Sequence, residues 1–176
     1  MPLMIGILKG AMSNRRVTVR CLIVAAMACP MLMSMQVLAG EQIDETKATS
    51  ADVRIRIHNP RGEVDIRGWD KDAIRIQGEL DDLTEKFVFD VTNRHAIIDV
   101  RLPRRNARWG DGSDLEIMIP RSALVDFRGI STSLRVTDLQ GGLRAHNVSG
   151  EVSVSGIDSK MMIKTMSGGI DVQQSS

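Results

Sequence analysis

Arginines cluster beside a tryptophan in the segment "RLPRRNARWGDGSD", residues 101–114, and this cluster is the part of the sequence best suited to bind a ligand. Guanidinium groups pair with carboxylates and phosphates in a bidentate manner, and an indole ring stacks on the face of a sugar. The cluster therefore suggests a site for a sugar or an anionic envelope polymer. The alternative is a solvated loop whose indole folds back over the edge of the fold. The candidate ligand-binding residues are Arg101, Arg104, Arg105, Arg108 and Trp109.

Other side chains that could do chemistry show no useful spacing. His58, His95 and His146 are scattered and have no cysteine near them, so they do not predict a metal site. No serine lies in a G-x-S-x-G motif, and no G-G-x-G-x-D calcium repeat is present. The outward positions of the repeat described below carry no ladder of carboxylates. We therefore predict no catalytic residues, no metal and no cofactor, and a protein that is not an enzyme.

The first 39 residues have the features of a secretory signal peptide. Basic residues and no acidic ones precede the apolar run "CLIVAAMACPMLMSMQV", and Val37 and Ala39 provide the small residues before a cleavage site. We predict cleavage after Ala39, export to the periplasm or cell envelope, and no membrane span afterwards. The alternatives are a retained membrane anchor and lipid attachment at Cys29, and Met12 is an alternative start to Met1.

Charge excludes one class of partner. The segment carries four basic residues and no acidic residue, so its removal takes the formal net charge from +1 to −3. A mildly acidic chain has no electrostatic reason to bind nucleic acid. Both cysteines also lie within the removed segment.

The remaining chain is predicted to be all-β. Residues 40–50 are polar and aperiodic and predict a flexible lead-in, and residues 51–176 predict one domain. Apolar residues two positions apart mark short strands, because successive side chains of a strand point to opposite sides. These runs are 53–57, 63–68, 73–78, 86–91, 96–102 and 115–119.

A nine-residue repeat dominates the last third of the chain. Counted from Leu134, the first, third and sixth slots are all apolar as far as Val172, and the eighth slot is glycine or serine. The first and third slots fit one side of a strand, the sixth fits a buried anchor beyond a bend, and the eighth fits a tight corner. This cycle favours a parallel β-solenoid, since each coil needs the next to cover its apolar surface. The alternative is an antiparallel β-sandwich or meander, and the sequence leaves open whether a coil has two or three sides.

The segments "IHNPRGEVDIRGWDKDAIRIQGEL" (57–80), "VSGEVSVSG" and "KTMSGGIDV" resemble an adhesin-like bacterial cell-envelope family, a domain of unknown function with V-S-G repeats. The resemblance covers roughly residues 51–174 and implies a β-solenoid at the cell envelope, without catalytic residues. We expect a non-enzymatic envelope module that binds or scaffolds through an extended β-surface. The alternatives are a polysaccharide-acting enzyme on a β-helix and a periplasmic partner in envelope-stress signalling. A chain shortened at its C-terminus would expose its final coil, which suggests self-association there.

Overall fold

The computed structural model describes residues 40–103 and 111–173. Residues 37–176 form one compact unit, and every described residue belongs to it. All described strands and core residues lie within that unit. In the described ranges, no helix has the length and apolar character needed to cross a membrane.

The described residues form an all-β structure of eleven strands in one mixed sheet, and they include no helix. Each of the six runs predicted from alternating apolar residues lies largely within a strand. The first two of these runs belong to one 16-residue strand, β2, which includes Asn59 and Pro60 at the corner between its two halves. The strands are β1 (Gln42–Ala48), β2 (Arg54–Trp69), β3 (Ala73–Glu79), β4 (Lys86–Thr92), β5 (His95–Arg101), β6 (Ser113–Pro120), β7 (Leu124–Thr137), β8 (Leu143–Ser149), β9 (Val152–Ser155), β10 (Met161–Ser167) and β11 (Ile170–Gln173).

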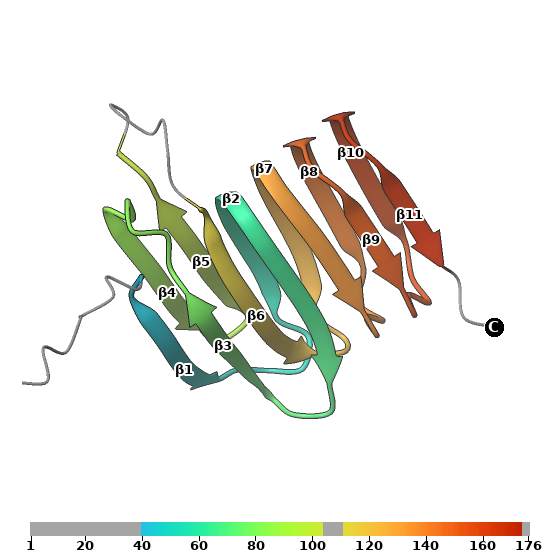
Figure 1. The fold of residues 1–176 in the computed structure, drawn as a ribbon. Coiled ribbons are helices and arrows are strands. Elements are labelled where there is room, and N and C mark those ends of the chain that lie inside the picture. Colours follow the sequence, from blue (N-terminus) through green and yellow to red (C-terminus); the bar gives the residue numbers. More distant parts are fainter. Residues whose placement is uncertain (1–39, 104–110, 174–176) are drawn as a thin grey trace, which may run out of the picture. The chain divides into compact units, whose positions relative to one another are not determined.

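The strands form two layers (Figure 1). The long strands β2 and β7 each contribute one half to each layer. Layer 1 contains β4, β5, residues 54–58 of β2, residues 124–131 of β7, β8 and β10. Layer 2 contains β1, β3, β6, residues 62–69 of β2, residues 134–137 of β7, β9 and β11. Both layers contribute inward side chains to one buried cluster.

Parallel neighbours in the last third are 18 residues apart. Val125 pairs with Leu143, and Leu143 pairs with Met161 in layer 1. Leu134 pairs with Val152, which pairs with Ile170 in layer 2. Two nine-residue cycles therefore separate hydrogen-bonded neighbours, and consecutive cycles alternate between the layers.

Pairing at the other side of the sheet is antiparallel, so the sheet is not parallel throughout. β1 pairs with β3, β3 with β6, and β4 with β5 in this way. The flexible lead-in predicted for residues 40–50 is wrong in its central part, which forms β1. Polar contacts hold this strand: Arg75 donates two hydrogen bonds to Asp44, at 3.0 and 2.9 Å. Such contacts carry no apolar period that the sequence could reveal.

The first and third slots of the repeat point inward, as predicted, and are buried until the last coil. Leu134, Val136, Val152 and Val154 are at most 2% exposed. In β11 the corresponding Ile170 and Val172 are 47% and 46% exposed, because no described strand covers them.

The sixth slot is only half as predicted. Leu139 is fully buried and Ile157 nearly so, whereas Val148 is 42% exposed and Met166 79% exposed. The two corners of a coil differ: Asp138 and Gly156 have positive φ values of 57° and 64°, and the residue after each of them turns inward. At the other corner Asn147 is the buried residue, and the residue after it points outward. The structural period is thus 18 residues, although the apolar period is nine.

Asn147 closes its corner with side-chain hydrogen bonds. Its Nδ2 donates to the carbonyl oxygens of Thr132 at 2.6 Å and Ser149 at 2.8 Å. Gly150 follows with a φ of +109°, and a Cβ there would lie 2.4 Å from the Thr132 carbonyl oxygen. Glycine is required at this corner because only a residue without Cβ fits against the preceding coil.

Candidate functional site

The outward side of layer 1 is basic. Side chains alternate between inward and outward in β2, β7, β8 and β10. The apolar residues point inward, and the basic residues between them point outward. The register places Arg56 beside Asp126, Asp126 beside Arg144, and Arg144 beside Met162. The next outward row holds His58, Arg128, His146 and Lys164. We call the part of this surface on β2, β7, β8 and β10 the basic face; its cations are Arg54, Arg56, Arg128, Arg144, Lys164 and, just before β10, Lys160.

Most of these cations have no carboxylate partner. Arg128 lies 3.7 Å from Asp126. Among the residues that the structure describes, no carboxylate oxygen lies within 4.0 Å of Arg54, Arg56, Arg144, Lys160 or Lys164. Asp126, which the register places between Arg56 and Arg144, is the carboxylate among the described residues of this face, so the face carries a net positive charge.

An open groove of about 450 Å³ crosses the basic face over β7, β8 and β10. One wall is basic and the other apolar, because two outward rows run side by side across the three strands. The apolar row consists of Ile130, Val148 and Met166, which the 18-residue step places on neighbouring strands. The groove is lined by His58, Arg128, Gly129, Ile130, His146, Asn147, Val148, Lys164 and Met166.

The outward side of layer 2 has the opposite charge, and we call it the acidic face. Its carboxylates include Glu63 beside Asp114 and Asp65 beside Glu116 on the paired strands β2 and β6. The side chains of Glu63, Asp65, Asp114 and Glu116 line a groove of about 340 Å³. No group of three or more metal-ligating side chains with suitable geometry occurs within residues 40–103 and 111–173.

Arginines neutralise much of the acidic face. Arg67 contacts Asp65 at 2.9 Å and Glu116 at 3.5 Å, and Arg135 contacts Glu63 at 3.2 Å. The hydrogen bond that Arg67 donates to Asp65 raises the pKa of Arg67 further above its usual value. This arrangement differs from that of the basic face, where the charges are largely unpaired.

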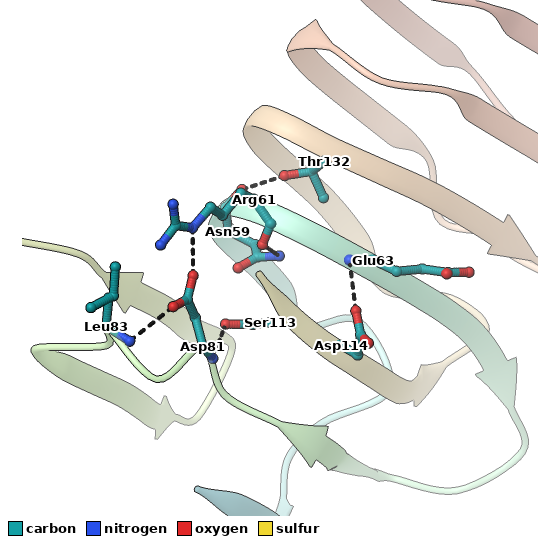
Figure 2. Close-up of polar contacts among 8 residues, drawn as sticks. All are labelled: Asn59, Arg61, Glu63, Asp81, Leu83, Ser113, Asp114 and Thr132. Carbon is teal, nitrogen blue, oxygen red and sulfur yellow. Dashed lines mark hydrogen bonds and ion pairs between the residues drawn. The ribbon is translucent and has the colours of Figure 1, made fainter. Parts of the chain in front are cut away.

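A buried ion pair links the corner of β2 to the loop after β3 (Figure 2). The Arg61 Nε donates to Asp81 Oδ2 at 2.5 Å, and the Asp81 side chain is fully buried. Its other carboxylate oxygen accepts the Leu83 amide at 2.8 Å, and the Asp81 amide donates to Ser113 Oγ at 2.9 Å. Burial alone would raise the pKa of Asp81, but the hydrogen bonds from Arg61 and Leu83 outweigh it and lower the pKa. These contacts fix the loop to the core.

Of the five residues proposed as ligand-binding, Arg101 is described, at the end of β5. Its Nε donates to Asp99 Oδ2 at 2.7 Å, and Asp99 also contacts His58 Nδ1 at 2.9 Å. Burial acts to raise the pKa of Asp99, but the hydrogen bonds from Arg101 and His58 lower it overall. Arg104, Arg105, Arg108 and Trp109 lie outside the described residues.

Sequence reasoning missed both charged faces. It treated the second and fourth slots as common outward columns, whereas the 18-residue coil divides each column between the layers. Arg144 and Met162 lie on the basic face, but Arg135, Ser153 and Asp171 from the same slot lie on the acidic face. Sorting outward residues at intervals of 18 instead of nine would have revealed the basic face.

Comparison with known proteins finds similarity among solved structures only. No family model matches the sequence, and no curated protein matches it. Among solved structures, the chain is similar to a protein from Clostridium sporogenes described as a "putative cell adhesion protein". The TM-score is 0.43 at 9% sequence identity, and the match covers 77% of this chain and 100% of that chain.

Proposed function

We propose that the protein is an exported, non-enzymatic module of the bacterial cell envelope, built as a two-sided β-solenoid that binds through an extended β-surface. The parallel 18-residue step of β7, β8 and β10 supports the solenoid. The leader-like residues 1–39 and the resemblance to adhesin-like envelope domains support export and location.

The observation that carries the binding function is the set of unpaired cations on the basic face. Ion pairs occupy the arginines of the acidic face. Arg144 and Lys164 project from neighbouring strands, and no carboxylate of the described residues forms an ion pair with either of them. Unpaired like charges on adjacent strands repel each other and therefore do not stabilise the fold. An anionic partner would neutralise them, and bacterial envelopes are rich in anionic polymers and lipids.

Co-sedimentation with washed bacterial envelopes tests this function. Residues 40–176 should sediment with the envelopes, and the double variant Arg144→Gln/Lys164→Gln should remain largely in the supernatant. The matched control, Arg67→Gln/Arg135→Gln, removes the same charge from the acidic face and should sediment like the unaltered protein. Equal sedimentation of the two double variants would contradict binding through the basic face.

Export has a separate test. Cell fractionation should place the protein in the periplasm or envelope, and its mass should correspond to a chain that begins at Gly40. A cytoplasmic protein that retains residues 1–39 would contradict the proposal.

One observation favours a second candidate, an enzyme that acts on polysaccharides. Asp65 and Glu116 lie side by side in the groove of the acidic face, and paired carboxylates are what glycoside cleavage uses. Their contacts with Arg67 suit an ion-pair network better than proton transfer. Release of reducing ends from envelope polysaccharides, abolished by Asp65→Asn, would favour the enzyme over the binding module.

The exposed inward positions of β11 support a further proposal, that copies of the protein associate through this edge. Light scattering across a concentration series should then show a dimer or larger species. A monomer at every concentration would contradict it.

A further inference from the structure

We propose that the basic face docks onto an anionic lipid surface; this rests on the binding function proposed above and specifies its partner. Eight large apolar residues are exposed among those that the structure describes. Six of them project from the outward side of layer 1, and the other two are the inward residues of β11. The six are Ile97, Leu124, Ile130, Val148, Met162 and Met166.

These apolar side chains lie beside cations of the basic face on neighbouring strands. Leu124 pairs with Arg54, Ile97 with Arg56, and Met162 with Arg144. Ile130, Val148 and Met166 form a row beside Arg128, His146 and Lys164, with about 5 Å between neighbouring strands. The acidic face has no exposed large apolar side chain among its described outward residues. Unpaired positive charge and exposed apolar surface therefore coincide on one face.

An anionic bilayer complements both properties together. Phosphate groups would neutralise the cations, while the aliphatic side chains would enter the boundary between headgroups and acyl chains. Long Lys and Arg side chains can keep their charges at the headgroups while their methylene groups pack against apolar surface. A polysaccharide suits the face less well, because sugar rings stack on aromatic side chains and the described part of the basic face presents none.

Vesicle binding by residues 40–176 tests the proposal. Vesicles of phosphatidylglycerol and phosphatidylcholine should bind the protein, and vesicles of phosphatidylcholine alone should not. Each cation near an anionic surface contributes roughly a fivefold gain in partitioning, so Arg144→Gln/Lys164→Gln should weaken binding at least tenfold. Arg67→Gln/Arg135→Gln should change binding less than twofold, and circular dichroism should show that both variants remain folded.

A second pair of variants distinguishes lipid from an anionic glycan. Val148→Ser/Met166→Ser removes apolar surface but no charge, so it should weaken vesicle binding several-fold and leave binding to polyuronate unchanged. Binding to polyuronate but not to phosphatidylglycerol vesicles would overturn the lipid proposal, and so would vesicle binding insensitive to the apolar variant. In either case, the proposed function would stand if Arg144→Gln/Lys164→Gln still failed to sediment with envelopes. If this variant sedimented like the unaltered protein, the proposed function itself would be refuted.

Discussion

Replacing Leu139 by alanine should strongly destabilise the protein, whereas Met166→Ala should have almost no effect, although both residues occupy the sixth slot of the repeat. Leu139 is fully buried and Met166 is 79% exposed. Removing the buried methylene and methyl groups of leucine costs about 2.4 kcal/mol in transfer free energy, and the cavity raises the loss to about 3–4 kcal/mol. The exposed methionine should cost less than about 0.5 kcal/mol.

Urea unfolding followed by circular dichroism measures the difference. With an m-value of about 2 kcal/mol/M, Leu139→Ala should lower the unfolding midpoint by roughly 1.5–2 M, with little change in the m-value. Met166→Ala should overlay the unaltered protein. Similar losses for the two variants would show that the sixth slots are equivalent, and would refute the assignment of two different corners to each coil.

Three further predictions concern the loop after β3 and the corners. Asp81→Asn removes the charge that faces Arg61 and should cost about 3 kcal/mol in unfolding free energy, whereas the exposed Asp82→Asn should cost under about 0.5 kcal/mol. The lowered pKa of Asp81 means that its stabilisation is present above the unfolded-state value near 3.8 and is lost as pH falls through the lower folded-state value. Unfolding midpoints of Asp81→Asn and the unaltered protein should therefore converge in acid, and a constant gap would contradict this. Gly150→Ala should lower the free energy of unfolding by about 1–3 kcal/mol, because the φ of Gly150 is +109°. Gly169→Ala should be tolerated, because the nearest atom to its added Cβ would be 3.9 Å away. Equal thermal midpoints for the two variants would refute the corner geometry.

Strand positions could be predicted because burial on one side imposes an alternating pattern. Val152 and Val154 point inward as that pattern requires. The number of cycles per coil could not be predicted, because every cycle presents the same apolar slots. β1 was not predicted for a different reason. Polar contacts such as that between Asp44 and Arg75 stabilise this strand, and its sequence shows no alternating apolar pattern.

The charged faces depend on register, which no local pattern encodes. Glu63 and Asp114 are 51 residues apart in sequence, and they become neighbours only because β2 and β6 pair in parallel. Arg144 and Lys164 likewise become members of one face only once β8 and β10 are placed side by side. The arginine cluster at 101–108 was predicted to bind a ligand because its members are close in sequence. The cations of the basic face are distant from one another in sequence, so no such local cluster indicates them.

The basic face exists only if residues 18 apart are neighbours and residues nine apart lie on opposite layers, and paired cysteines test this most directly. With Cys21 and Cys29 replaced by serine, Arg144→Cys/Met162→Cys should form a disulfide under mild oxidation, because these residues are register partners on adjacent strands. Arg144→Cys/Ser153→Cys, nine residues apart, should stay reduced. Cross-linking of the second pair but not the first would contradict the two-layer coil and the basic face with it.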